Sequence, residues 1–203
     1  TIINATVGAI TAEGGIGLVL NNAAVGNLTT TSTTGASGSI GISNSANSSI
    51  ANITSASTLG NVGTLTFSNC FDIVVTGSVS MAQAATTGTF SVGAVTMTNC
   101  YSIRFAGTTT ITMSSSDNTG TIGGLNINSS NQDISFAGNV RITGYANNTN
   151  LSSNVVITSI YCVSCVFSGF FINHRTVGFN TWEGGTITTV NLHKCFFRSR
   201  TRI

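Results

Sequence analysis

The sequence has few charged residues and no proline, and these absences limit the class of protein. Only 6% of the 203 residues are charged, against about 25% in a typical globular domain. Chains of this kind are often disordered, but disordered chains also lack apolar residues. Here 41% of the residues are hydrophobic, so the chain can build a core. Thr, Ser, Asn and Gly replace the missing charges, which is typical of a rigid, hydrogen-bonded β-structure.

Long apolar runs are also missing. Residues 7–20 are the most apolar part of the N-terminal region, but they contain Glu13 and four glycines. They fall short of the roughly 18 apolar residues that a transmembrane helix needs. They also lack the basic start and the cleavage pattern of a signal peptide. The sequence predicts no membrane span, and the initial Thr suggests a mature or excised fragment.

The five cysteines are an odd number, which fits poorly with a secreted disulfide framework. Cys162 and Cys165 form a CxxC pair, but residues 161–167 are predicted to be a buried strand. Zinc would need two further ligands, and the nearby candidates are His174, His193 and Cys195. We expect free, packed thiols and neither a metal nor another cofactor, with a disulfide or a metal site as the less favoured alternatives.

The basic residues gather at one end of the chain. The first 103 residues contain neither Lys nor Arg, and five of the seven basic residues lie in the last 29. A basic tip suits contact with an acidic neighbour, a polyanionic glycan or nucleic acid. The favoured interpretation is a solvated end that caps the fold or leads into another domain, so nucleic acid is not an expected partner.

Internal repeats decide the predicted fold. Residues 65–77 and 95–107 match at a constant offset of 30, with apolar positions on apolar positions and Asn-Cys-aromatic in both. A third copy begins at Leu125 and continues one residue late at Ile134. Weaker copies extend the series, and the one at 18–22 is placed 22 residues before 40–44. The weaker copies are at 18–22, 40–44, 155–157, 165–169, 190–192 and 195–197.

Each copy follows the same order of elements. A short alternating strand ends at a polar corner, usually with Asn, and a second strand ends at Gly. Alternation of this kind is the period of a strand with one buried face. A period that drifts from 22 to 31 residues argues against propeller blades and leucine-rich repeats. It favours a β-solenoid, in which extra residues bulge out at a corner without disturbing the stacked strands.

We therefore predict an all-β fold, a right-handed parallel β-helix of about seven coils. The coils occupy residues 1–169, and residues 170–203 form an irregular aromatic segment and a final coil or cap with a basic C-terminus. The absence of proline fits, because every interior coil needs its N–H groups for its neighbours. The constant offset predicts two interior columns of side chains, one of Leu65, Val95 and Leu125 and the next of Phe67, Met97 and Ile127.

An asparagine recurs at one corner of the copies, at Asn22, Asn44, Asn69 and Asn99. Asparagine tolerates the left-handed backbone of a sharp corner better than most residues. Side chains stacked about 4.8 Å apart can also hydrogen-bond to one another. The series predicts an asparagine ladder with Asn69 and Asn99 in adjacent coils.

A charge-poor β-helix with irregular coils and these repeats resembles the shaft or body domains of bacteriophage and other viral tailspikes and tail fibres. The resemblance is architectural and covers most of the chain. It implies a homotrimer that contacts other virion proteins and recognises a host cell-surface polysaccharide. It also implies a place at the virion surface or tail, extracellular in function, after folding in a reducing host cytoplasm that suits free thiols. Pectate-lyase-like enzymes and secreted adhesin passengers share this architecture, so the fold alone does not assign the activity.

Catalytic side chains are scarce. Glycan cleavage usually needs two carboxylates about 5–9.5 Å apart, and the chain has five acidic residues. Asp72 and Asp133 occupy roughly equivalent positions two coils apart, so their backbones are expected about 10 Å apart, with Arg104 in the coil between. Asp72, Asp133 and Glu183 are weak catalytic candidates, and solvated acids without catalysis are the favoured interpretation.

Residues 170–185 hold the single Trp together with other aromatic and charged residues. Such a segment suits a binding loop, with Trp182 as a stacking platform for a sugar. The polar candidates for contacts with that sugar are His174, Arg175 and Glu183. A hydrophobic cap or a contact between subunits is the favoured alternative.

The leading hypothesis is a structural and receptor-binding component of a virion, without catalysis in this chain. The alternatives are a glycan-cleaving tailspike enzyme, either a polysaccharide hydrolase or a lyase, and a bacterial surface adhesin passenger. The odd number of cysteines disfavours the adhesin.

Overall fold

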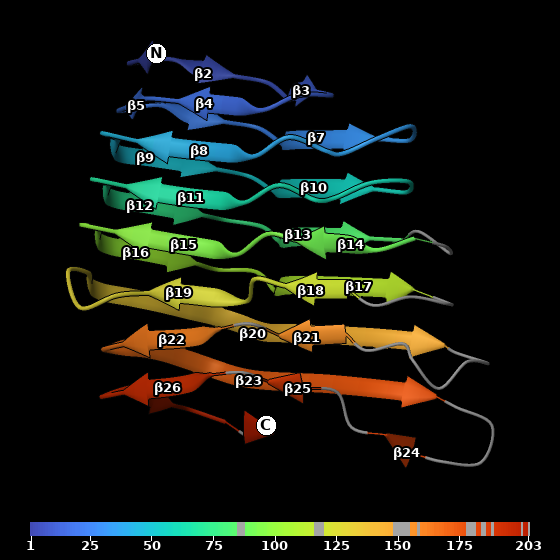
Figure 1. The fold of residues 1–203 in the computed structure, drawn as a ribbon. Helices are drawn as coiled ribbons and strands as arrows, with labels where there is room; N and C mark the ends of the chain where they lie inside the picture. Colours follow the sequence, from blue (N-terminus) through green and yellow to red (C-terminus); the bar gives the residue numbers. More distant parts are fainter. Residues whose placement is uncertain are drawn as a thin grey trace.

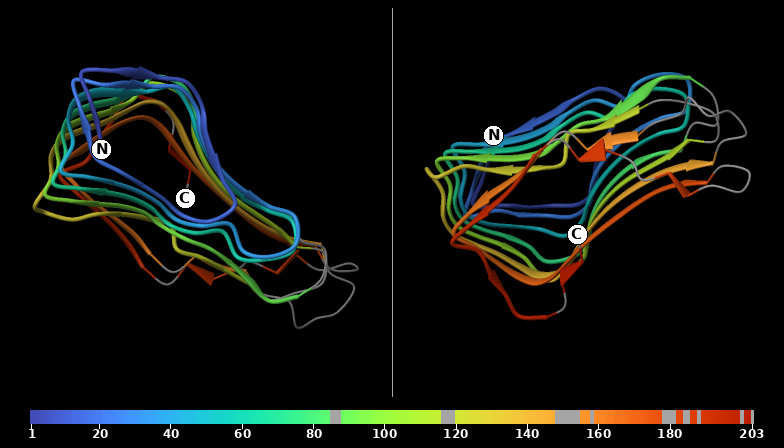
Figure 2. Two further views of the ribbon diagram at one scale, coloured as in Figure 1. Left: turned by 90° about the horizontal axis from the view of Figure 1, so that it is seen from above. Right: turned by 60° about the horizontal axis from the view of Figure 1, so that its bottom comes forward.

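The fold is given by a computed structural model that describes residues 1–84, 88–115, 120–147, 155–157, 159–177, 182–183, 186–187, 189–199 and 201–202. Every regular element in these ranges is a β-strand, and the strands form three sheets of 17, 7 and 4 strands. The chain passes from sheet to sheet and returns beside its previous passage (Figure 1). Seen from above, successive passages nearly superimpose (Figure 2). The predicted all-β, parallel architecture is confirmed, and the arrangement is compatible with a β-solenoid.

The 7-stranded sheet contains one strand from each passage of the chain, in the spatial order β26-β22-β19-β15-β11-β8-β4. All its pairs are parallel. Its strands are β4 (Ile16–Leu18), β8 (Ile40–Ser43), β11 (Leu65–Ser68), β15 (Val95–Thr98), β19 (Leu125–Ile127), β22 (Ile160–Val163) and β26 (Val190–His193).

The 17-stranded sheet consists of two parallel runs that β20 (Gln132–Asn147) and β23 (Cys165–Val177) join. The first run contains β1 (Ile2–Ile3), β2 (Thr6–Val7), β5 (Leu20–Asn21), β6 (Ala24–Val25), β9 (Ala46–Ile50), β12 (Phe71–Val75), β16 (Tyr101–Phe105) and β27 (Phe196–Phe197). The second run contains β3 (Ile10–Ala12), β7 (Leu28–Ser32), β10 (Ile53–Ser57), β13 (Val79–Gln83), β17 (Thr109–Ser115) and β28 (Thr201–Arg202). One strand, β24 (Trp182–Glu183), pairs antiparallel with β23.

The 4-stranded sheet contains one strand from each of the later passages, and its pairs are also parallel. Its strands are β14 (Phe90–Val92), β18 (Gly120–Ile122), β21 (Val155–Ile157) and β25 (Thr186–Ile187). No helix in the described ranges is long and apolar enough to cross a membrane.

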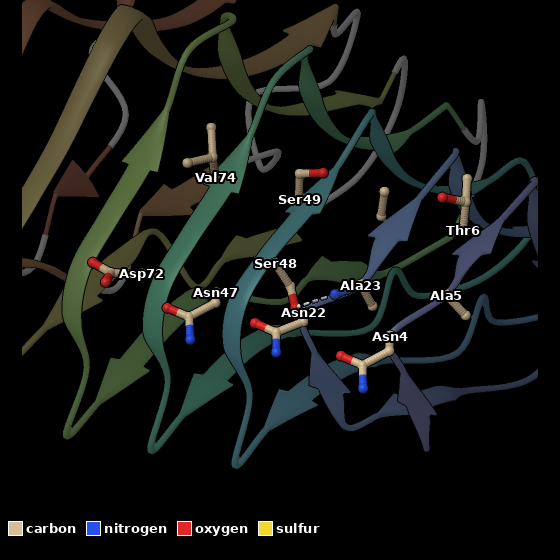
Figure 3. A pocket seen from close by; sticks show the side chains of 11 residues that line it. Asn4, Ala5, Thr6, Asn22, Ala23, Asn47, Ser48, Ser49, Asp72 and Val74 are labelled. Atoms are coloured by element: carbon tan, nitrogen blue, oxygen red, sulfur yellow. Dashed lines mark hydrogen bonds between the residues drawn. The ribbon is translucent and has the colours of Figure 1, made fainter.

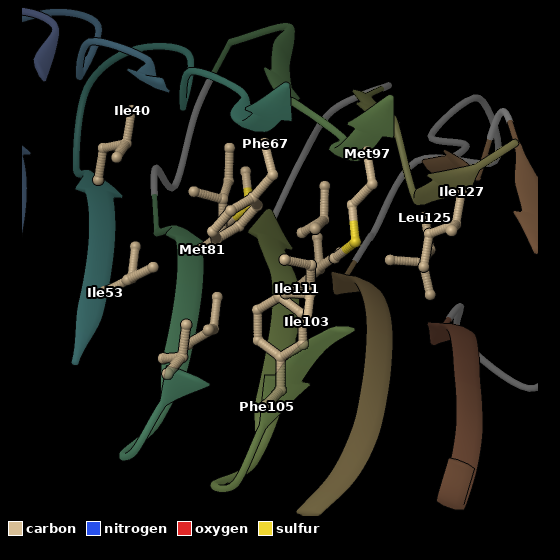
Figure 4. Close-up of a cluster of buried hydrophobic side chains, with 14 of the residues drawn as sticks. Ile40, Ile53, Phe67, Met81, Met97, Ile103, Phe105, Ile111, Leu125 and Ile127 are labelled. Atoms are coloured by element: carbon tan, nitrogen blue, oxygen red, sulfur yellow. The ribbon is translucent and has the colours of Figure 1, made fainter. Parts of the chain in front are cut away.

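The 30-residue offset of the best repeats is confirmed by the strand register. The one-residue slip in the third copy is confirmed as well, because Ile103 pairs with Ile134. The side chains that were predicted to form two interior columns are all buried, and those of Phe67, Met97 and Ile127 point into the same interior (Figure 4). The columns are Leu65, Val95 and Leu125 in one and Phe67, Met97 and Ile127 in the next.

Two of the weaker sequence alignments and one predicted strand were wrong. Leu18 pairs with Ile42 and not with Ile40, an offset of 24 rather than 22, because the strand pairing places Ile16 beside Ile40. The continuation of Leu125 is Ile160, whereas residues 155–157 form β21 in the 4-stranded sheet. The third error concerns residues 161–167, which are two strands in two sheets and not one.

The sequence also missed part of each passage. After the glycine that ends the second predicted strand, a further strand follows, such as β13 after Gly77 and β17 after Gly107. A side chain at Gly107 would collide with the carbonyl group of Gly77 in the adjacent passage. The glycine therefore permits close backbone contact between passages at a bend and does not mark their end.

The interior changes character along the chain. Between residues 30 and 57 the core contains small polar side chains, and the buried ones are Thr30, Ser37, Ser45, Ser48, Ser55 and Ser57. Further along, phenylalanines of successive strands stack on one another. The ring centroids of Phe105 and Phe136 lie 4.7 Å apart, and those of Phe136 and Phe167 lie 5.0 Å apart.

The predicted division of the chain at residue 170 falls within β23. Residues 170–177 continue this strand in register with β20. Phe170 is fully buried, and its ring contacts those of Phe167 and Phe197. The aromatic residues at this point thus extend the interior stack.

Candidate functional site

The corner between the 7-stranded sheet and the 17-stranded sheet is built on left-handed backbone. Eleven non-glycine residues in the described ranges have positive φ, and the strand register places them in two columns. The shorter column contains Asn44, Asn69 and Asn99, with φ of 47°, 52° and 52°. The longer column contains Asn4, Asn22, Asn47, Asp72, Ser102, Asp133, Ser164 and Lys194.

The shorter column is an asparagine ladder, as predicted. The amide Nδ2 of Asn69 donates to Oδ1 of Asn44, and Nδ2 of Asn99 donates to Oδ1 of Asn69, both at 3.2 Å. The three residues are exposed, so the amides are not shielded from water. Asn22 was assigned to this ladder wrongly: it lies beside Asn47, in the longer column.

The longer column changes which side chains face outward. In β12, Phe71 and Asp72 both point away from the core, and Ile73 is the first buried residue. A left-handed residue at the start of the strand interrupts the ordinary alternation, as in a β-bulge. Ser102 is also left-handed and interrupts the alternation of β16. Tyr101, the residue before it, therefore also lies at the surface.

Phe71 and Tyr101 form an exposed aromatic pair, which we call the aromatic platform. Their side chains are 45% and 46% exposed, although both are large and largely apolar. They are register partners in β12 and β16, and their rings stack with centroids 5.4 Å apart and planes inclined by 13°. The platform is a flat, rigid apolar surface at the corner of the molecule.

Amide and hydroxyl groups border the platform. A shallow cleft of about 230 Å³ beside it is lined by Asn99, Cys100, Tyr101, Ser130 and Gln132. The hydroxyl Oγ of Ser130 accepts a hydrogen bond from the backbone N–H of Asn99 at 3.0 Å. The exposed amide of Gln132 lies beside Tyr101 in the register. Hydrogen-bonding groups thus lie next to an apolar face.

On the N-terminal side of the platform lies an open groove of about 680 Å³, and Asp72, the residue after Phe71, is one of its lining residues. Asn4, Asn22, Asn47 and Asp72 stand in a row along it (Figure 3). The groove is hollow because its other lining residues are mostly small, among them Ala5, Ala23, Ala24, Ser48 and Ser49. Within the described part of the chain no hydrogen bond joins the amides of this row to one another, in contrast to the ladder, so they are available to a ligand. We call this feature the asparagine groove.

Charged side chains lie at the C-terminal side of the same surface. Asp72, Ser102 and Asp133 are successive members of the longer column, so the prediction that the two acids occupy equivalent positions is confirmed. Adjacent strands are about 4.8 Å apart, which places the two Asp backbones about 10 Å apart. Asp72 is half-buried and Asp133 is exposed. Arg104 is exposed between them, on the strand that contains Ser102.

The predicted glycan contacts at Trp182, Arg175, Glu183 and His174 have side chains outside the described part of the structure. Their backbones belong to β23 and β24, where Val177 pairs with Trp182 and Thr176 pairs with Glu183. The sequence did not identify the platform, although Phe71 and Tyr101 occupy the same position in the two best repeats. An aromatic residue two positions after the left-handed asparagine, in both repeats, was the available signal.

The five thiols are free of disulfides, and only Cys195 is not fully buried. In the described ranges no cluster of three His, Cys, Asp or Glu side chains could hold a metal ion. A hydrogen bond with the thiol of Cys162, together with burial, raises the pKa of Cys165. A hydrogen bond with Cys165, together with burial, likewise raises the pKa of Cys195.

No protein-family model matches the chain, and no curated protein or solved structure is significantly similar to it.

Proposed function

We propose that the chain is a right-handed parallel β-helix of about seven coils that acts as a structural and receptor-binding component of a virion, in a tailspike or tail fibre. The parallel register, with offsets of 25, 30 and 31 residues between successive copies, supports the helix. Connections between parallel strands of one sheet are right-handed in about 98% of cases, which supports the hand. Homotrimeric assembly with contacts to other virion proteins is part of the proposal.

The receptor is proposed to be a host cell-surface polysaccharide that lies along the asparagine groove and ends on the aromatic platform. The stacked, exposed pair of Phe71 and Tyr101 is the observation that carries this proposal. A sugar ring presents C–H groups on its face and hydroxyls at its edge, so it suits an aromatic face bordered by amides. Neighbouring amides of the row are about 4.8 Å apart, which is comparable to the length of one hexose unit, so each strand would meet about one sugar.

The surface favours a largely neutral glycan. The groove is lined by three asparagines, alanines and serines, and Asp72 is its single charged residue. A strongly anionic polymer would meet one carboxylate there and no cation. The exposed cation Arg104 lies between Val74, a lining residue of the groove, and the uncharged Ser135 in the register, so one cation beside the groove faces its one carboxylate. Shape and hydrogen bonds, rather than net charge, would then select the ligand.

The test is binding of the intact chain to an array of neutral and acidic bacterial surface polysaccharides. Tyr101→Ala is expected to weaken binding of a selected glycan about tenfold, because a loss of about 1.4 kcal/mol of stacking corresponds to that factor. Phe196→Ala is the matched control, since Phe196 is 61% exposed but lies at the end of the described strands. Equal affinity of Tyr101→Ala and the parent would refute the platform, and light scattering on the same samples gives the assembly state.

Glycan cleavage is the second candidate, favoured by one observation. Asp72 and Asp133 lie in one column on the same surface, about 10 Å apart at the backbone. Inverting glycosidases hold their two carboxyl groups about 6.5–9.5 Å apart. If the chain cleaves, the bound polysaccharide releases new reducing ends, and Asp133→Asn abolishes this release without weakening binding. Binding without release leaves the chain a receptor-binding protein.

A further inference from the structure

Two buried cysteines lie directly behind the aromatic platform. Cys70 precedes Phe71 and Cys100 precedes Tyr101, so the two cysteines are neighbours at the same corner of adjacent passages, just before β12 and β16. The backbone N–H of Tyr101 donates to the carbonyl oxygen of Cys70 at 2.9 Å, which fixes this neighbourhood. The side chains are 2% and 1% exposed. The thiol of Cys70 donates to the carbonyl oxygen of Ile42 at 3.3 Å, and the thiol of Cys100 donates to that of Thr98 at 3.4 Å.

The spacing of the two residues suits a disulfide. Adjacent strands of a sheet are about 4.8 Å apart, and the Cα atoms of a disulfide are usually about 4.4–6.8 Å apart. Both side chains point to the same interior, so a rotation about Cα–Cβ would bring the sulfurs to bonding distance. The bond would therefore not require the two backbones to change their register.

The two thiols differ in reactivity. The neighbouring thiol of Cys70 lowers the pKa of Cys100 to about 7. The same contact and burial raise the pKa of Cys70. Cys100 thus becomes the thiolate, which is the nucleophilic form of cysteine, and Cys70 stays protonated beside it. Cys100 lines part of the cleft next to Tyr101 but is only 1% exposed, so the cleft is the side from which a small reagent would approach it.

We propose that Cys70 and Cys100 form a peroxide-oxidisable dithiol that links two adjacent strands of the stack by a reversible disulfide. The Cys100 thiolate attacks one oxygen of a hydroperoxide, the O–O bond breaks, and the sulfur becomes a sulfenic acid while hydroxide or alkoxide leaves. The Cys70 thiol then attacks that sulfur, an S–S bond forms, and water leaves. In total, two thiols are oxidised and one hydroperoxide is reduced to water and, for an alkyl hydroperoxide, an alcohol.

The link would fix the platform from behind. A bond between residues 70 and 100 ties together the residues that immediately precede Phe71 and Tyr101, so the two rings would be held in register. The remaining thiols are less suited to this reaction, because the pKa values of Cys165 and Cys195 are raised. The proposal does not depend on glycan binding.

The experiment treats the intact chain with hydrogen peroxide, alkylates the remaining thiols in denaturant and maps the peptides by mass spectrometry. Chymotrypsin is the suitable protease, because the first 103 residues contain no Lys or Arg for trypsin. The expected product is a Cys70–Cys100 cross-link that dithiothreitol reverses. Free, fully alkylated Cys70 and Cys100 after treatment, or cross-links confined to Cys162, Cys165 and Cys195, would overturn the proposal.

The pH profile of the same reaction tests the role of Cys100. With a pKa of about 7, the thiolate fraction and hence the initial rate rise about tenfold from pH 6 to pH 8. A thiol at its ordinary pKa of 9.0 would instead give a rise of about 90-fold over this interval, which would contradict the assigned role.

Two variants complete the test. Cys70→Ser leaves Cys100 without its partner, so a sulfenic acid that dimedone traps should accumulate in place of the cross-link. Cys162→Ser is the matched control, a buried cysteine of the same chain, and should retain the cross-link. If Cys70→Ser does not fold, the peptide map and the pH profile of the parent still decide the question.

Discussion

The interiors of the two halves differ in the side chains that complete their apolar cores, although one strand register runs through both. Around residues 30–57 hydrogen-bonded hydroxyl groups lie in the core beside buried isoleucines: Oγ1 of Thr30 donates to Oγ of Ser55 at 2.9 Å, and Oγ of Ser37 lies 3.1 Å from the same atom. The register partner of Ser55 in the next passage is Met81, and that of Ser37 is Val62. Hydrogen-bonded polar positions therefore become apolar within one passage.

The contrast shows what the stack requires. Strands of one passage pair with those of the passages above and below, so a local core needs to be complete only with respect to these neighbours. Small hydroxyl side chains meet this condition by hydrogen-bonding to one another. A column of phenylalanines meets it by ring stacking, and its members are Phe105, Phe136, Phe167 and Phe197. The backbone hydrogen bonds between strands are common to both halves and set the frame.

The largest expected effect is in the aromatic half. Phe136→Ala removes a ring that is 1% exposed and stacked on both sides, and should lower the free energy of unfolding by about 3–5 kcal/mol. Chemical denaturation monitored by circular dichroism measures this loss. Phe136→Leu, which keeps most of the volume, should lose much less. Similar losses for both variants would show that ring stacking, rather than volume, matters there.

A smaller effect is expected in the polar half. Ser55→Ala leaves the buried hydroxyls of Thr30 and Ser37 without a shared partner, at a cost of about 1–3 kcal/mol. The triple variant Thr30→Val, Ser37→Ala and Ser55→Ala removes all three hydroxyls and should recover part of that loss, because only the carbonyl oxygen of Gly38, which Thr30 contacts at 3.1 Å, then loses a partner. Additive losses in the triple variant, measured by the same denaturation, would contradict the comparison.

The smallest effect is expected at the surface ladder. Asn69 is exposed, so Asn69→Ala costs no buried amide and should lose about 1–2 kcal/mol from its left-handed backbone. Asn69→Gly loses the same amide contacts but adopts this backbone freely, so it should be closer to the parent in thermal denaturation. Equal destabilisation of both variants would assign the effect to the hydrogen bonds of the ladder.

The candidate site was only partly predictable from the sequence. The repeat at residues 65–77 and 95–107 placed Asp72 correctly relative to Asp133, because a constant offset is visible as a pattern of residue types. The same repeat contained Phe71 and Tyr101, but alternation predicts only which residues could be buried. Their exposure depends on the left-handed Asp72 and Ser102, and serine gives no signal for that conformation. The asparagine groove also required the register, which pairs Asn22 with Asn47.

The sequence by itself determined the β-class, the parallel stacking and the best interior columns, because these depend on a local period of two and on offsets between similar segments. Only the tertiary structure decided that Leu18 pairs with Ile42, that Cys162 and Cys165 lie in different sheets, and that Cys70 contacts Cys100. Passages of unequal length shift the pairing by a residue or two, and such a shift is set by interstrand hydrogen bonds and packing. A single chain read in one dimension does not contain those contacts, so its register is fixed only when the passages are stacked.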